Sequence, residues 1–229
     1  MSFYHFNPLY TESSNGPKGF IPYTDNGGLV VGVAGEDYAV IASDTRLANS
    51  FHILSRHQQK TFKLNDKAAI GLTGCFADAT SLVKFVKTNM LIYEQDHHKL
   101  MSIGALAQML QVMLYFKRFF PYYVSTVLVG LDGEGQGWVY NYDPVGSYER
   151  CKCYAAGSGA SQPLLDNQVL KTNMKGALEE PMPMKTAISL IKDVFTSAAE
   201  RQIHVGDCVK IMIVTKHGVT QESFELRKD

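Results

Sequence analysis

The sequence predicts an α+β fold in which two antiparallel sheets pack face to face and helices cover both outer faces, a four-layer α-β-β-α sandwich. Apolar segments typical of strands alternate with pairs of amphipathic segments, in the order four strands, two helices, three strands, two helices and two strands. Runs of strands separated by pairs of helices require two sheets with helices on their outer faces. No internal repeat, composition break or linker divides residues 26–229, so we expect one domain there.

Residues 1–25 precede that domain and are expected to form an extended arm or leader. Prolines and the segment Ser13-Ser14-Asn15-Gly16-Pro17 disfavour regular structure, but aromatic residues are interleaved with them. A disordered tail is normally poor in aromatic residues. Two interpretations therefore stay open, an arm that wraps over a surface and a flexible leader.

The first four strands are predicted as two hairpins. Strands rich in β-branched and small apolar residues flank the turn Gly35-Glu36-Asp37, and a second pair turns at Asn65-Asp66. The four strands are expected at residues 29–34, 38–43, 61–64 and 68–74. Asp44 and Arg46 follow the second strand directly, so charged groups gather at the end of a rigid hairpin.

The remaining elements follow from apolar spacing and from glycine-rich turns. Helices are expected at residues 78–93, 102–117, 160–170 and 184–202, and strands at 125–131, 138–142, 148–155, 208–215 and 219–226. The glycines at 133, 135 and 137 join two strands and do not open a helix, which disfavours a nucleotide-phosphate loop. His97 and His98 fall in a polar connection and are interpreted as solvated loop residues, so no metal site is expected.

Bulk properties exclude several classes of function. The 229 residues are 45% apolar and 19% charged, and 22 basic residues balance 22 acidic ones, so no net field attracts nucleic acid or an anionic membrane. The four cysteines match neither a zinc site nor a redox pair, which favours reduced thiols in an intracellular compartment. No segment approaches the roughly 18 apolar residues that span a membrane, and no basic segment followed by an apolar core stands at the N-terminus, so we expect no standard secretory signal. No cofactor is expected.

Five short motifs, in order over some 200 residues, resemble the proteasome β-type subunits, a family of N-terminal-nucleophile hydrolases. The motifs are Ala42-Ser43-Asp44-Thr45-Arg46, Gly71-Leu72-Thr73-Gly74, Gly157-Ser158-Gly159, Ala198-Ala199-Glu200-Arg201 and Gly206-Asp207. Four further segments resemble one non-catalytic member, at the sixth position of the eukaryotic β ring. These are Phe119-Phe120-Pro121-Tyr122-Tyr123 and the segments 142–148, 162–168 and 226–229.

The resemblance implies where a catalytic centre would lie. Active members use an N-terminal threonine whose hydroxyl attacks the peptide carbonyl while its own α-amine accepts the proton. Counting from Asp44, which matches the family aspartate, puts the nucleophile position at Gly28 and the family lysine at Lys60. Because glycine has no hydroxyl, we expect a non-catalytic subunit. The chain also lacks a Gly-Thr junction at which it could cleave itself, which leaves trimming of the leader by an active neighbour.

The supporting residues of the family are only partly present. Ser158 matches the family serine, but Gln202 stands where an aspartate is expected and Val205 where a serine is expected. Asp44 and Lys60 are therefore interpreted as a buried or partly buried ion pair that fixes the hairpin, in preference to catalytic groups. Asp132 matches a position that in the family borders the substrate cleft of the adjacent subunit.

The resemblance implies partners as well as a compartment. The expected partners are the β subunits at the fifth and seventh positions of the same ring, β subunits of the facing ring, α-ring subunits, and unfolded protein substrates bound through the complex. Cytoplasm and nucleus are the expected locations. Two alternatives remain, a divergent peptidase that uses Thr24, Thr45 or Ser158 as its nucleophile, and a free-standing regulatory protein.

Overall fold

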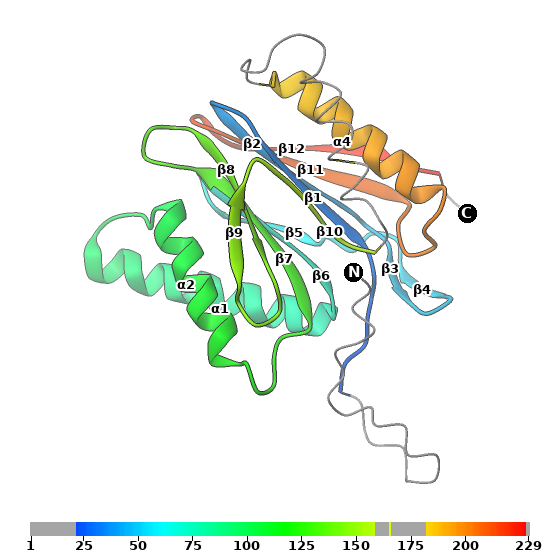
Figure 1. Cartoon of the computed structure of the whole chain (residues 1–229), viewed down its shortest axis with the longest axis horizontal. Helices are drawn as coiled ribbons and strands as arrows, with labels where there is room; N and C mark the ends of the chain where they lie inside the picture. Colours follow the sequence, from blue (N-terminus) through cyan, green and yellow to red (C-terminus); the bar gives the residue numbers. More distant parts are fainter. Residues whose placement is uncertain (1–21, 159–164, 166–181, 228–229) are drawn as a thin grey trace.

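The computed structural model describes residues 22–158, 165 and 182–227, and it has two five-stranded sheets that pack face to face (Figure 1). Both sheets are antiparallel throughout. The arm expected at residues 1–25 lies outside the described residues up to position 21, and so does most of the helix expected at 160–170. The described residues confirm the α+β sandwich.

The first sheet has the strand order β10-β1-β2-β11-β12. Its strands are β1 (Leu29–Ala34), β2 (Tyr38–Asp44), β10 (Cys153–Gly157), β11 (Cys208–Thr215) and β12 (Gly218–Glu225). The predicted first hairpin forms its centre, and β1 pairs with β2 in a register that sets Val30 opposite Ser43. Asp44, the last residue of β2, is thereby placed beside the start of β1.

The second sheet has the strand order β5-β6-β7-β8-β9. Its strands are β5 (Thr61–Asn65), β6 (Ala68–Gly74), β7 (Val124–Leu131), β8 (Gly137–Tyr142) and β9 (Tyr148–Cys151). The helices α1 (Phe76–His97) and α2 (Ile103–Phe116) cover its outer face, and α4 (Met184–Ala199) covers the outer face of the first sheet (Figure 1).

The core is divided into three layers because successive strand residues point to opposite faces. Val30 packs between the two sheets, whereas its neighbour Val31 packs under α4 with Phe195. Leu82 and Leu106 of the other helices pack on the outer face of the second sheet. Every residue of β1 is buried, as expected for a strand that is covered on both faces.

Several sequence-based assignments differ from the structure. The helix predicted at 78–93 runs from Phe76 to His97, so His97 belongs to its last turn and only His98 lies in the connection that follows. The single strand predicted at 148–155 is two strands, because the chain bends at Lys152 and passes from the second sheet to the first. A small hairpin of β3 (Leu47–Asn49) and β4 (His52–Ser55) lies where the sequence predicted no strand; four of its seven strand residues are exposed, which weakens the apolar pattern. The last helix ends at Ala199 instead of residue 202.

Candidate functional site

The candidate site lies at the start of β1, where Gly28, Asp44 and Lys60 meet. Gly28 immediately precedes β1, Asp44 ends β2, and Lys60 immediately precedes β5 in the other sheet. The Leu29 amide donates a hydrogen bond of 2.9 Å to Asp44 Oδ1. The two sheets therefore bring together three positions that are up to 32 residues apart in the sequence.

Lys60 and Asp44 form a buried ion pair. Lys60 Nζ donates to Asp44 Oδ1 at 2.8 Å and to the Arg46 carbonyl oxygen at 2.5 Å. The side chains are 1% and 0% exposed, respectively. Burial raises the pKa of the Asp44 carboxyl, and Lys60 opposes that rise. Among the described residues Asp44 Oδ2 has no hydrogen-bond partner.

Gly28 occupies a position at which a side chain would be strained and would require Lys60 to shift. Its φ of +95° lies in the region that side chains disfavour. A Cβ atom here would overlap Lys60 Nζ and would lie 3.0 Å from Asp44 Oδ1. The Lys60 ammonium group thus lies where a Cβ atom at position 28 would project.

Ser158 and His204 flank the two glycines before β1. The Ser158 amide donates a hydrogen bond of 2.7 Å to the Gly28 carbonyl oxygen. A Cβ atom on Gly27 would lie 3.3 Å from Ser158 Oγ and 2.6 Å from His204 Cβ. Sequence reasoning placed Ser158 at the centre but missed His204, because nothing in the sequence predicts which loop residue packs against Gly27.

The two positions that depart from the family pattern lie in the connection between α4 and β11. Val205 is 1% exposed and packs in the apolar core under α4. Its amide donates to the Gln202 carbonyl oxygen at 3.2 Å. An apolar side chain at 205 cannot donate or accept a hydrogen bond, so it cannot orient an α-amine.

Thr45 and Thr24, the other candidate nucleophiles, have different surroundings. Thr45 is 1% exposed, and its hydroxyl donates a hydrogen bond of 2.8 Å to the Arg56 carbonyl oxygen. Thr24 is exposed and lies four residues before Gly28. Neither arrangement presents a hydroxyl beside Lys60.

Asp132 stabilises its own turn between β7 and β8. Its Oδ1 accepts hydrogen bonds from the amides of Glu134 and Gln136, and its Oδ2 accepts one of 2.9 Å from Trp138 Nε1. Slight burial raises the pKa of Asp132, but these hydrogen bonds outweigh it and the net pKa is lowered. The carboxylate is therefore held in its charged form in a fixed orientation.

Asn26 is a second residue that sequence reasoning did not single out. It is 8% exposed, lies two residues before Gly28, and forms hydrogen bonds to both β3 and the end of β6. The only signal in the sequence is an Asn-Gly-Gly triplet, which predicts a turn and not a buried anchor.

The described part of the chain was also searched for other kinds of site. Within it, no group of three His, Cys, Asp or Glu side chains is arranged to hold a metal ion. None of its helices is both long enough and apolar enough to cross a membrane.

Comparison with known proteins adds the family context. Residues 24–214 match the family model described as "Proteasome subunit". The chain is 48% identical over 213 residues to "Proteasome subunit beta type-1-B" of Carassius auratus, covering 92% of this chain and 90% of the relative. It is 47% identical over 214 residues to "Proteasome subunit beta type-1" of Arabidopsis thaliana, with 91% and 96% covered. It is 46% identical over 232 residues to "Proteasome subunit beta type-6" of Saccharomyces cerevisiae, with 96% of each chain covered.

Proposed function

The chain belongs to the proteasome subunit family, and we propose that within the 20S core particle it acts as a structural subunit that cuts no peptide itself. Its similarity to beta type-1 relatives extends over more than nine-tenths of its length. Its role is to complete the β ring and to shape the chamber in which neighbouring threonine-protease subunits degrade proteins.

The geometry at Gly28 carries this proposal. N-terminal-nucleophile peptidases need a side-chain hydroxyl or thiol beside the free α-amine of the same residue. Gly28 supplies neither group, and Lys60 Nζ occupies the space where one would project. The Asp44–Lys60 pair then serves the fold, because a buried ion pair that loses one partner leaves an uncompensated charge.

The proposal is tested by measuring peptide hydrolysis in core particles whose active threonines in the other β subunits are substituted. We expect no threonine-type activity to remain, because this chain has no nucleophile beside Lys60. Residual activity that disappears on Ser158→Ala, Thr24→Ala or Thr45→Val would identify this chain as a divergent peptidase. A matched particle with one active threonine retained shows that the assembly and the assay are intact.

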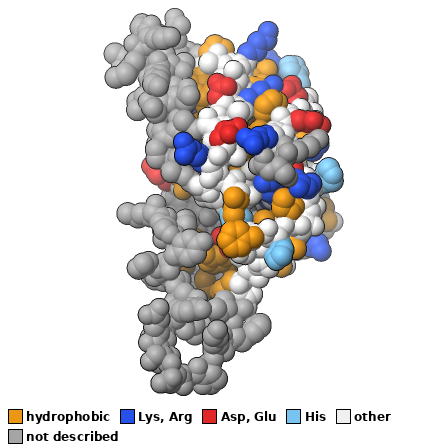
Figure 2. Space-filling view, turned by 90° about the vertical axis from the view of Figure 1, so that its right-hand side faces the viewer, with side chains coloured by type: hydrophobic (Ala, Val, Ile, Leu, Met, Phe, Trp, Pro, Cys, Tyr) orange, Lys and Arg blue, Asp and Glu red, His pale blue; other side chains and the backbone are white. Residues whose placement is uncertain are grey.

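The proposed partners are the β subunits at the fifth and seventh positions, β subunits of the facing ring, and α-ring subunits. Basic and acidic side chains are intermixed with hydrophobic ones on the face drawn in Figure 2, in keeping with 22 charges of each sign. Such a surface favours contacts defined by shape and local pairing over attraction by a net field. Cross-linking of the intact particle followed by mass spectrometry is expected to link this chain to those positions, and links to other positions instead would contradict the assignment.

Asp132 is proposed to border the substrate cleft of the adjacent subunit. Its carboxylate is held by three hydrogen bonds from its own turn, so it would present a fixed negative charge. Asp132→Asn should lower the neighbour's preference for basic over acidic peptides, with hydrolysis by the other active subunits unchanged. Unaltered selectivity in correctly assembled particles would argue against this role.

The compartment is proposed to be both cytoplasm and nucleus. Fractionation of cells followed by detection of this chain in assembled particles tests that proposal, and the presence of the chain in only one fraction would contradict it.

A further inference from the structure

Residues 22–27, here termed the strap, lead into β1 and are bound to three separate parts of the fold. The strap reaches β3, the end of β6 with the start of α1, and the segment after α2. Its anchoring residues are Tyr23 and Asn26. The Asp25 carboxylate adds a local hydrogen bond of 2.8 Å from the Gly27 amide, which fixes the turn that follows.

Asn26 forms four hydrogen bonds, two through its backbone and two through its side chain. Its amide donates to the Gly74 carbonyl oxygen at 3.0 Å, and its carbonyl oxygen accepts from the Ala48 amide at 3.2 Å. Its Nδ2 donates to the Ala48 carbonyl oxygen at 3.1 Å, and its Oδ1 accepts from the Phe76 amide at 2.9 Å. The free edge of β3, and the last residues of β6 beyond its pairing with β5, are the kind of backbone groups that bind an added extended peptide.

The contact with Phe76 also completes a helix. Phe76 is the first residue of α1, and Cys75 at the N-cap makes no side-chain capping bond. The first amides of a helix lack partners within the helix, and a side-chain oxygen normally satisfies one of them. Here Asn26 supplies that oxygen from 50 residues away in the sequence.

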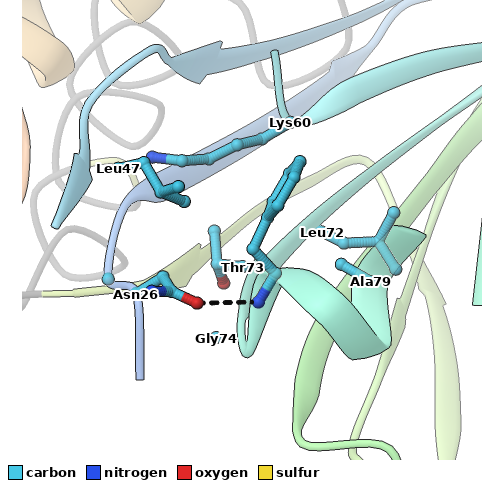
Figure 3. Close-up of a pocket in the computed structure, with 9 residues that line it drawn as sticks. Asn26, Leu47, Lys60, Leu72, Thr73, Gly74 and Ala79 are labelled. Atoms are coloured by element: carbon cyan, nitrogen blue, oxygen red, sulfur yellow. Dashed lines mark hydrogen bonds between the residues drawn. The ribbon is translucent and has the colours of Figure 1, made fainter. Parts of the chain in front are cut away.

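Asn26 lines a small pocket beside the site formed by Gly28, Asp44 and Lys60, here termed the remnant centre (Figure 3). The other lining residues are Gly27, Leu47, Lys60, Leu72, Thr73, Gly74, Phe76 and Ala79. The side chain of Asn26 points towards the start of α1, and Lys60 extends across the opposite side (Figure 3). The lining residues pack so closely that the pocket does not admit a water-sized sphere.

Tyr23 anchors the other end of the strap. Its hydroxyl donates a hydrogen bond of 2.7 Å to the Pro121 carbonyl oxygen, and its ring lies 5.5 Å from the Phe120 ring and 5.3 Å from the Tyr123 ring. The Tyr123 carbonyl oxygen accepts a hydrogen bond of 2.8 Å from the Cys75 amide, so the segment that Tyr23 packs against is itself bonded to the residue after β6. The Cys75 thiol is free and 7% exposed.

We propose that the strap takes the place of a bound peptide beside Gly28: Asn26 occupies the backbone groups of β3, of the end of β6 and of the start of α1 that a peptide would use, and Tyr23 anchors the strap on residues 120–123. The remnant centre is then closed as well as lacking a nucleophile. This closure is independent of the missing hydroxyl, and it requires that residues 22–27 stay attached to the domain.

The test uses the assembled core particle with Asn26→Ala in this chain. Loss of two buried side-chain hydrogen bonds should speed amide exchange in peptides covering residues 45–50 and 74–80 by about tenfold. Alkylation of Cys75, followed by peptide mass spectrometry, should accelerate to a similar extent. Asn65→Ala is the matched control, because Asn65 makes a local hydrogen bond to the Lys67 amide on an exposed turn. It should change neither rate.

Two further variants separate the anchors of the strap. Asn26→Asp keeps the oxygen that accepts from Phe76 and loses the donor to Ala48, so exchange should rise at 45–50 and stay slow at 74–80. Tyr23→Ala should expose Cys75 to alkylation while Phe76 stays protected. Unchanged rates in both variants would overturn the closure. The Asn26→Asp and Tyr23→Ala variants therefore test the closure even if particles with Asn26→Ala fail to assemble.

The intact mass of the subunit distinguishes this inference from the proposed function. A subunit that begins after Tyr23 but before Gly28 would contradict closure by Tyr23, and peptide hydrolysis would still be absent. A subunit that begins at Gly28 would remove the strap altogether. Activity traced to this chain, with the strap still attached and protected, would overturn the lack of catalysis and leave the closure standing.

Discussion

Two constraints act on Gly28 at once, its backbone angle and the volume around it. The φ of +95° excludes most side chains, and Lys60 Nζ fills the space that a Cβ atom would need. A side chain at position 28 would need the backbone angle to change and Lys60 Nζ to move away. Substitution of this single residue would therefore not rebuild a working centre.

Gly28→Ser tests that conclusion. We expect no peptide hydrolysis, and we expect destabilisation because a strained φ alone costs about 1–3 kcal/mol and the clash with Lys60 adds to it. The matched control is Gly133→Ser, where a new Cβ meets no atom within 4 Å. Thermal denaturation of assembled particles should show a lower midpoint for the first variant only, and hydrolysis gained by Gly28→Ser would contradict the expectation.

The buried pair of Lys60 and Asp44 is expected to respond strongly to loss of one partner. Lys60→Met should cost about 3–5 kcal/mol, because it leaves the Asp44 carboxylate buried without its cation. Lys60→Met combined with Asp44→Leu should recover much of that loss. Lys63→Met, in the exposed pair with Asp66, serves as the control and should have no measurable effect. Denaturant titration of the particle gives the comparison, and equal effects at 60 and 63 would contradict it.

At the scale of elements, Asp207 connects the β3–β4 hairpin to the segment before β11. Its carboxylate forms ion pairs with Arg46, at 2.9 Å, and with Arg56, and Arg46 also donates to the Ile203 carbonyl oxygen at 3.0 Å. Burial raises the pKa of Asp207, but hydrogen bonds and charge from the two arginines outweigh it and leave the pKa below its ordinary value. The β3–β4 hairpin is thus held by these ion pairs as well as by the few backbone hydrogen bonds between its two strands.

The ion pairs of Asp207 should make the free energy of unfolding depend on pH on the acidic side. Because the pKa of Asp207 is lower in the folded state than the ordinary 3.8, its contribution is fully present above that pH and is lost as the pH falls through the folded pKa. Asp207→Asn should therefore be less stable than the parent by about 3 kcal/mol near neutral pH. The difference in free energy of unfolding between the parent and Asp207→Asn should become smaller below pH 3.8. If the difference in free energy of unfolding between the parent and Asp207→Asn stays constant from neutral to acidic pH, the Asp207 ion pairs do not stabilise the fold in this way.

At the scale of the whole molecule, the central strands are covered on both faces while several helix residues remain exposed. Val112, Tyr115 and Phe116 of α2 are all more than half exposed, although the opposite side of that helix is buried. Exposed apolar residues grouped on one element are typical of a surface that a partner covers. This arrangement agrees with a subunit that functions within a larger assembly.

The corresponding prediction concerns size. The chain has a mass of 25.4 kDa, and we expect nearly all of it in cell extracts to elute with the core particle. Gel filtration followed by detection of this chain provides the measurement, with a separate cytosolic protein of similar mass as the reference. A main population that elutes as a free monomer would favour the alternative of a free-standing regulatory protein.

Much of the fold could be predicted because local patterns specify it. Nearly continuous apolar runs predicted β1, β2, β6 and β11, each with at least one boundary correct, and helical spacing predicted α1, α2 and α4. These patterns are read within a single segment, so no knowledge of distant contacts is needed. The bend at Lys152 was missed because the residues on both sides of it favour strands equally well, and only sheet membership separates them.

The sequence by itself determined that Gly28 lacks a hydroxyl and that Asp44 and Lys60 stand at matching positions, since identity and spacing are properties of the chain. Only the tertiary structure decided that Lys60 Nζ fills the space beside Gly28, and that Asn26 caps α1 from 50 residues away. Both contacts join segments of different sheets or helices. Their geometry depends on how the layers pack, and no local pattern in the sequence encodes that packing.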